Sequence, residues 1–295
     1  MVMLKALYFP GTSNTELPLL FLLTVCQICT FAENQCMSGF LFNEIVFGPV
    51  KSRRFGVSLG INLLPETMKY CSFNCIYCEC GLTDDEQEKR VKLLPADELE
   101  NAIRQRFEAL KKDGLKPDNI TFAGNGEPTM HPAFPAIIDL TVDLRNQYFP
   151  GTQITVLSNS TRLHIPEVRN ALLKIDNNVL KLDAGSELMY QRINRPSTPV
   201  TLAAIVEQLA GFKGNLIVQS LFLKGTVNGQ SVDNTTPEEV RLWTTHILKI
   251  KPSLVMLYSF SRETPEKELQ RISKETLQEI AGNLKDTGIP FEVFE

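Results

Sequence analysis

Three cysteines stand close together in one short stretch of the chain. Cys71, Cys75 and Cys78 have the spacing C-x3-C-x2-C, and apolar and aromatic residues lie between them. Three thiolates on so short a loop can hold an iron–sulfur cube, and the apolar neighbours would shield that cube from water. Because such cubes normally take four cysteine ligands, a loop that supplies three leaves one iron open to a ligand from outside the protein.

A structural zinc site is the alternative interpretation of this loop, with Cys80 as the fourth ligand. Zinc sites of that kind usually use two well-separated ligand pairs, and no cysteine follows Cys80 in the chain. Buried cysteines without a metal are a second alternative, which requires the spacing to arise by chance. A zinc site would make the protein a non-enzymatic zinc-binding module. Metal content separates the two, because iron with sulfide is brown and zinc is colourless.

The composition of the chain excludes several classes of protein. With 43% hydrophobic and 22% charged residues, the 295-residue chain has an ordinary globular composition. The net charge of −4 provides no global positive field for a polyanion and mildly disfavours RNA. Seven cysteines are an odd number and too clustered for a disulfide scaffold, which favours a reducing, cytoplasmic location. The longest apolar stretch, residues 17–32, is short and interrupted by Pro18, so we expect no membrane span.

Two parts of the chain differ in pattern. Residues 1–36 show little periodicity and contain three of the cysteines. We expect them to be an N-terminal extension outside the fold, with Met37 near the natural start and residues 37–295 forming one domain. Strands are expected at residues 55–63, 120–123, 154–157, 179–182, 216–223, 254–258 and 291–294. Helices are expected after Pro95, from about residue 133, at 166–173 and 202–209, after a capping box of Thr236 and Glu239, and before Gly288, which would end the last helix.

This alternation of strands and helices is typical of βα units. It predicts an α/β fold, a partial or complete (β/α) barrel, in preference to a doubly wound sheet. Polar residues follow the expected strands: the cysteine loop, then residues 124–128, then Ser158 and Asn159, then Asp183. In a barrel the carboxyl ends of the strands meet on one face, so these residues would converge there.

Cys71, Cys75 and Cys78, with the aromatic Tyr77 directly before the last cysteine, resemble the signature of the radical S-adenosylmethionine (radical SAM) superfamily. The resemblance implies a [4Fe–4S] cluster bound by Cys71, Cys75 and Cys78, with S-adenosylmethionine (SAM) at the fourth iron. It further implies reductive cleavage of SAM to methionine and a 5′-deoxyadenosyl radical, which abstracts hydrogen from a substrate. An electron donor such as flavodoxin or ferredoxin is implied as a partner. Within the superfamily, the chain looks most similar to small members related to tRNA wyosine-synthesis and molybdenum-cofactor enzymes.

Other residues match the superfamily one by one. The segment FAGNGEPTMHP resembles its glycine-glycine-glutamate element, with Gly126 and Glu127 matching and Asn125 at the place of the first glycine. The implied role is to bind the SAM ammonium group, whereas a simple turn is the alternative. Ser158 and Asn159 resemble the polar pair that contacts the ribose and carboxylate, with a helix cap as the alternative. Cofactor contacts are also implied for Tyr77, Asp183 and Gln219, and Lys181 would share the strand face of Asp183. The alternative for Asp183, Gln219 and Lys181 is an interior polar group whose hydrogen bonds are satisfied within the protein.

The substrate is not determined by these residues. A small molecule, a peptide and an RNA all remain open, and no C-terminal cysteine cluster suggests an auxiliary iron–sulfur centre. His131 follows Glu127 at a helical metal spacing, but Pro128 and Pro132 disfavour a helix there. The basic run KSRR (residues 51–54) would meet a phosphate-bearing substrate or form a solvated face, and Arg262 would lie at the pocket mouth or on the surface.

Overall fold

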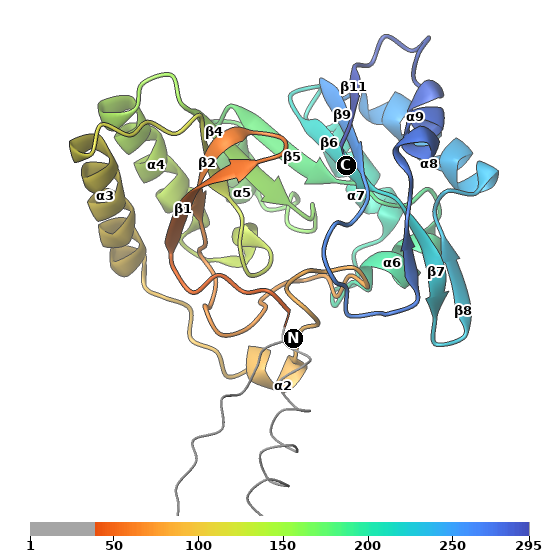
Figure 1. Ribbon diagram of the computed structural model, residues 1–295, viewed down its shortest axis with the longest axis horizontal. Coiled ribbons are helices and arrows are strands. Elements are labelled where there is room, and N and C mark those ends of the chain that lie inside the picture. The colour runs from red at the N-terminus through yellow and green to blue at the C-terminus, as the bar shows by residue number, and fades with distance from the viewer. Residues whose placement is uncertain (1–38, 295) are drawn as a thin grey trace, which may run out of the picture. The chain divides into compact units, whose positions relative to one another are not determined.

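A computed structural model describes residues 39–294, and the extension predicted for residues 1–36 lies outside this range. Its main feature is an eight-stranded sheet with the order β1-β2-β3-β4-β5-β6-β9-β11 (Figure 1). β1 and β2 pair antiparallel, and all the other neighbours in this sheet pair parallel. The strands are β1 (Val46–Ser52), β2 (Gly56–Ile61), β3 (Asn119–Phe122), β4 (Gln153–Ser158), β5 (Asn177–Lys181), β6 (Ile217–Leu221), β9 (Leu254–Tyr258) and β11 (Phe291–Val293).

The seven parallel strands of this sheet form where short apolar runs predict them, whereas β1 was not predicted. All four residues of β3 and all five of β6 are buried, as expected for parallel strands that are covered on both faces. The bounds of β9 are those predicted, and β11 ends one residue before the predicted position. Because β1 and β11 are the end strands and do not pair with each other, the sheet is an open partial barrel. The predicted α/β class and partial barrel are therefore confirmed.

Helices connect the parallel strands. They are α2 (Asp85–Glu88), α3 (Ala96–Lys112), α4 (Phe134–Tyr148), α5 (Pro166–Leu172), α6 (Glu187–Asn194), α7 (Leu202–Ala210), α8 (Pro237–Ile250) and α9 (Lys274–Gly282). Figure 1 shows α3 and α4 along one flank of the sheet and α8 and α9 along the other. No helix among residues 39–294 is long and apolar enough to cross a membrane.

Side-chain caps explain where several helices begin and end. Thr236 Oγ1 accepts a hydrogen bond from the Glu239 amide at the start of α8, as predicted. The Glu239 carboxylate does not complete a capping box, because it accepts from the amides of Gly185 and Ser186 instead. The last helix ends at Gly282 and not at Gly288, since the Asn283 side chain donates to the carbonyl of Ile280.

A second, antiparallel sheet was not predicted. It consists of β7 (Leu223–Val227), β8 (Gln230–Asp233) and β10 (Leu269–Arg271), in the order β10-β7-β8. The run 216–223, predicted as one strand, is divided between β6 and β7. Asn234 makes this division, because its side chain donates to the Leu221 carbonyl at 2.7 Å and accepts from the Leu223 amide at 2.8 Å.

Candidate metal and cofactor site

The cysteine loop is docked on the segment that follows β3. The amide of Tyr70 donates to the carbonyl of Asn125 at 2.8 Å, and the amide of Glu127 donates to the carbonyl of Tyr70 at 3.1 Å. Gly126 lies between these two bonds with φ of 143°. A Cβ atom at Gly126 would lie 1.8 Å from the Tyr70 carbonyl oxygen. The glycine is therefore required for this close approach of two backbones.

The other side of the loop is held by the end of α6. The amide of Asn74 donates to the carbonyl of Asn194 at 3.0 Å, and the amide of Ile76 donates to the carbonyl of Ile193 at 3.0 Å. The Phe73 ring also packs edge-on against the Tyr190 ring. Because these contacts join positions far apart in sequence, the fold as a whole fixes the loop that carries the cysteines.

The loop and the strand ends enclose one cavity of about 190 Å³. Nine of the predicted site residues line this cavity: Cys71, Cys75, Tyr77, Cys78, Gly126, Glu127, Ser158, Asn159 and Gln219. Asn125 and Asp183 are absent from its lining and lie behind the wall. Lys69, Cys80 and Lys181 also line it. The expected convergence of residues at the carboxyl ends of the strands is thus present in the structure.

Glu127 joins the ends of β3 and β4. Its carboxylate is buried, and its Oε1 accepts from the amide and hydroxyl of Thr129 and, at 2.9 Å, from the hydroxyl of Ser158. Its Oε2 accepts from the amide of Asn159 at 2.6 Å. Burial raises the pKa of Glu127, and these hydrogen bonds oppose the shift. Oε2, with one donor only, is the oxygen with remaining capacity for a further donor.

Asn159 connects β4 to the cysteine loop. Its side-chain nitrogen donates to Ser72 Oγ at 2.9 Å and lies 3.6 Å from Cys71 Sγ, while its side-chain oxygen accepts from Thr161. The side chain therefore bonds within the protein, although it lines the cavity. The helix cap given as the alternative is not formed: Ser158 Oγ accepts from the amide of Ser160 in a turn, and the next helix begins only at Pro166.

The Asn125 side chain holds backbone segments together and does not line the cavity. Its fully buried side chain accepts from the amide of Phe42 and donates to the carbonyls of Phe42 and Pro65. It ties the start of the described chain to the cysteine loop. Its side chain therefore points away from the cavity that we predicted it would contact, because it satisfies backbone groups that a glycine would leave without this partner.

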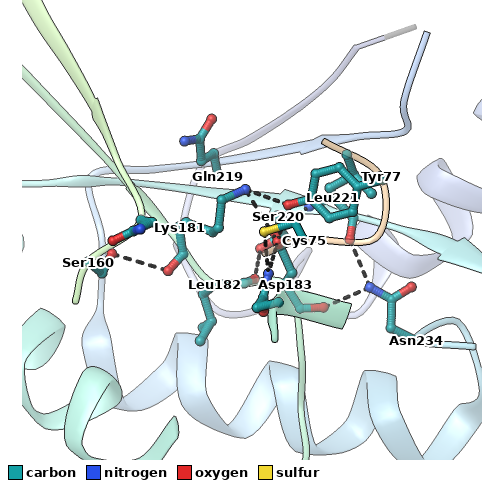
Figure 2. Close-up of polar contacts among 12 residues, drawn as sticks. Cys75, Tyr77, Ser160, Lys181, Leu182, Asp183, Gln219, Ser220, Leu221 and Asn234 are labelled. Atoms are coloured by element: carbon teal, nitrogen blue, oxygen red, sulfur yellow. Dashed lines mark hydrogen bonds and ion pairs between the residues drawn. The ribbon is translucent and has the colours of Figure 1, made fainter. Parts of the chain in front are cut away.

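Asp183 is the centre of a buried network (Figure 2). Its Oδ1 accepts from the amide of Leu221, and its Oδ2 accepts from Tyr77 at 2.5 Å, Asn194 at 2.9 Å and Lys181 at 3.3 Å. The side chain of Asp183 has no exposed surface. Lys181 and Asp183 contact each other, as their predicted shared face requires. The Asp183 carboxylate does not line the cavity, but it bonds Tyr77 and Lys181, which do.

The network sets the charge states of its members. Burial raises the pKa of Tyr77 well above 10.0, and the neighbouring Asp183 carboxylate acts in the same direction. Burial opposes the charged form of Lys181, yet the Asp183 carboxylate raises the pKa of Lys181 overall. The network therefore favours the cationic form of Lys181 and the neutral form of Tyr77.

The four cysteine sulfurs differ in acidity. Burial raises the pKa of Cys71 to about 12 and also raises the pKa of Cys75. The hydrogen bond from Cys80 lowers the pKa of Cys78 to about 5, and the same interaction raises the pKa of Cys80. Cys80 Sγ also lies 3.5 Å from the Gly124 carbonyl. Cys80 therefore favours the thiolate form of Cys78.

Lys69 is a site residue that sequence reasoning missed. Its side chain is buried, and its Nζ donates to the Asn74 side chain at 3.4 Å and the Gly81 carbonyl at 3.2 Å. Within residues 39–294 no carboxylate lies within 4.0 Å of it. Burial disfavours its charge, but the surrounding cysteines raise the pKa of Lys69 overall. Its position two residues before Cys71 was the available signal.

These donors fit an anionic iron–sulfur cluster. A buried ammonium without a carboxylate needs negative charge nearby, and three cysteine thiolates with a bound cluster would supply it. Amide groups also approach two of the sulfurs, since Asn194 Nδ2 lies 3.5 Å from Cys75 Sγ and the Phe73 amide 3.4 Å from Cys71 Sγ. In the described part of the chain, no three His, Cys, Asp or Glu side chains converge to hold a single metal ion.

Three weaker candidates have clear positions. His131 lies outside the cavity lining, and its ring nitrogens contact the Leu94 carbonyl and the Ala133 amide. Arg262 pairs with Glu79 on the surface. Arg54, from the basic run, donates to Gln219 Oε1 at 2.9 Å and is therefore close to the cavity.

Comparisons with known proteins identify relatives of the chain. The sequence model of the radical SAM superfamily matches residues 66–236. A UPF0026 protein of Synechocystis sp. is 32% identical over 250 residues, which are 83% of each chain. UPF0026 proteins of Methanocaldococcus jannaschii and Helicobacter pylori are 33% and 34% identical over 61% of this chain. The matched regions are 54% and 57% of these two relatives, so the chain spans little more than half of their length.

Solved structures share the fold. Streptococcus suis SuiB bound to S-adenosylmethionine is 14% identical with a TM-score of 0.57, covering 80% of this chain and 50% of that chain. A radical SAM methyltransferase from Sphaerobacter thermophilus is 16% identical with a TM-score of 0.58, covering 80% and 65%. The superfamily model matches residues 66–236, and the relative from Synechocystis covers most of the chain. The chain belongs to the radical SAM superfamily and to the UPF0026 family.

Proposed function

We propose that the protein is a radical SAM oxidoreductase that binds one [4Fe–4S] cluster through Cys71, Cys75 and Cys78. The observation that carries this proposal is that the three cysteines line the same cavity as Gly126, Glu127 and Asn159. When bound, the cluster and SAM would supply a 5′-deoxyadenosyl radical that abstracts hydrogen from the substrate. A reduced flavodoxin or ferredoxin in the cytoplasm would be the electron donor.

The residues of the chain would position the cofactors. Glu127 Oε2 has capacity to accept a hydrogen bond from the SAM ammonium group. Lys69 would balance the negative charge of the thiolates, and Asn194 and Asn159 would orient the cysteine side chains. Tyr77 and Phe73 would exclude water from the cysteine side of the cavity.

Anaerobic reconstitution tests the metal assignment. The expected content is about four irons per chain, with matching sulfide and brown absorbance. Cys71→Ala, Cys75→Ala and Cys78→Ala should each abolish it, whereas Cys80→Ala should retain most of it. Colourless protein that contains zinc, or equal loss in the Cys80 variant, would contradict the ligand assignment.

SAM binding tests the cofactor assignment separately. Reduced protein should release 5′-deoxyadenosine from SAM slowly in the absence of substrate. Glu127→Ala should lower SAM affinity more than it lowers iron content, because the carboxylate would bind the ammonium group and not the metal. Unchanged SAM affinity in this variant would show that Glu127 only joins the two strand ends.

A further inference from the structure

Arg54 extends from the turn between β1 and β2 to the opposite side of the partial barrel. The turn is fixed by Ser52 Oγ, which accepts from the amides of Arg54 and Phe55 at 3.2 Å each. Arg54 Nη1 donates to Gln219 Oε1 on β6 at 2.9 Å. Its guanidinium carbon also lies 5.0 Å from the centre of the Tyr258 ring on β9. The turn thus places a cation against two strands far along the chain.

The face that Arg54 contacts is the cavity face of the sheet. Lys181 and Gln219 are paired neighbours on β5 and β6, and both line the cavity that the cysteines line. Phe55, beside Arg54, packs on a small apolar cluster that includes Ile217, two residues before Gln219. Since side chains two apart on a strand share a face, Arg54 and Phe55 lie on the cavity side of the sheet.

The charge of Arg54 is not balanced by a carboxylate. Among residues 39–294 none lies within 4.0 Å of its guanidinium, whereas Lys181 on the same face pairs with Asp183. A guanidinium has five N–H donors, and Gln219 accepts from one of them. Figure 2 shows that the Gln219 side chain points away from Asp183. Gln219 therefore orients the guanidinium without neutralising it.

We infer that Arg54 binds an oxyanion group of the substrate, a carboxylate or a phosphate. The inference rests on the proposed function, because it assigns the substrate class of the same cavity. Arginine suits this role, since its planar fork binds carboxylates and phosphates through two parallel hydrogen bonds. Glu127, the residue implied for the SAM ammonium group, follows β3, whereas Arg54 contacts β6 and β9. The substrate anion would therefore bind on the far side of the cavity from the SAM ammonium group.

Three variants test the inference. Arg54→Gln removes the charge, and Arg54→Lys keeps it without the fork. Arg53→Gln is the matched control, because Arg53 is the exposed neighbour that donates to Ser261 Oγ. Each protein is reconstituted with iron and sulfide and saturated with SAM. Inorganic phosphate and acetate are then titrated in separate arms by calorimetry.

We expect the wild-type protein to bind at least one of the two anions. Arg54→Gln should weaken this binding at least about tenfold, because a hydrogen bond to a charged group is lost. Arg54→Lys should lie between the two, and Arg53→Gln should change the affinity less than about twofold. Tighter binding of phosphate identifies a phosphate group in the substrate, and tighter binding of acetate identifies a carboxylate.

Several results would overturn the inference. The first is equal anion affinity in wild type and Arg54→Gln. The second is that wild type binds neither anion. The third is that Arg54→Gln loses as much affinity for SAM as for the anion. Iron content and melting temperature of each variant show whether it is folded. Wild-type protein that fails to bind iron or SAM contradicts the proposed function instead. The same titration without cofactors then tests Arg54 by itself.

Discussion

Tyr77 Oη donates a hydrogen bond to Asp183 Oδ2 at 2.5 Å. Tyr77 belongs to the cysteine loop, and Asp183 lies two residues after the end of β5. The same carboxylate oxygen accepts from Asn194, whose side chain reaches Cys75 Sγ. A single buried carboxylate therefore joins the cysteine loop, the end of α6 and the sheet.

Asp183→Asn should destabilise the protein by about 3 kcal/mol, because the Lys181 ammonium would lose its carboxylate in a buried site. Iron binding should also fall, since Tyr77 and the cysteine loop lose a common anchor. Urea unfolding of the metal-free protein under reducing conditions measures the first effect. Iron content after reconstitution measures the second.

Asp139→Asn is the control for this experiment. Asp139 pairs with Lys174 on the surface, where both side chains are 51% exposed. Its loss should cost no more than about 1 kcal/mol. Equal stability of Asp183→Asn and wild type would show that the buried network does not anchor the loop.

Gly126→Ala should prevent the cysteine loop from docking after β3, since the added Cβ would meet the Tyr70 carbonyl oxygen at 1.8 Å. Gly114→Ala isolates this clash, because Gly114 also has positive φ, 69°, but no atom within 4 Å of the added Cβ. The control should lose about 1 to 2 kcal/mol from backbone conformation alone. Gly126→Ala should lose clearly more stability and most of its iron. Similar iron content in both variants would contradict the tight approach of the two backbones.

Asn194→Ala should lower the reduction potential of the bound cluster. The variant loses the amide donor 3.5 Å from Cys75 Sγ, and hydrogen bonds to sulfur favour the reduced, more negative state. A spectroscopic redox titration measures this potential. Gln191→Ala on the exposed face of α6 is the control, and its potential should equal that of wild type. A reduction potential that rises in Asn194→Ala would contradict the prediction that this hydrogen bond stabilises the reduced cluster.

His131 should contribute to a decline of stability in weak acid. Burial lowers the pKa of His131 below 6.5 in the folded protein. Both ring contacts also suit the neutral ring, since Nδ1 accepts from the Ala133 amide and Nε2 lies 3.0 Å from the Leu94 carbonyl. The unfolded state therefore binds the proton more readily. The stability from this group is complete above pH 6.5 and falls as the pH drops toward the lower folded pKa.

Urea unfolding between pH 5 and 8 measures this dependence, with ~6.5 as the unfolded reference. His131→Gln should lose stability at neutral pH, and the gap from wild type should narrow toward pH 5. NMR titration of the ring gives the folded pKa directly. A ring that titrates above its ordinary value would contradict the burial argument.

The sequence by itself determined the features that depend on local pattern. The spacing of Cys71, Cys75 and Cys78 is a local property, and it indicated a cluster loop before any fold was known. Apolar runs and helix caps predicted where the parallel strands and the helices lie along the chain. The bounds of β9 and the start of α8 at Thr236 followed from a few neighbouring residues. The convergence of polar residues at the strand ends followed from the barrel geometry.

Only the tertiary structure decided what each polar residue does. Asp183 and Asn125 are of residue types that often bind ligands, yet they bond to protein groups far away in sequence and do not line the cavity. Lys69 and Arg54 look like ordinary basic residues, and their burial among sulfurs or against β6 depends on which strands meet. A side chain is free for a ligand only when no protein group satisfies it. Whether a protein group satisfies it depends on contacts between residues far apart in sequence, and the local sequence does not specify these contacts.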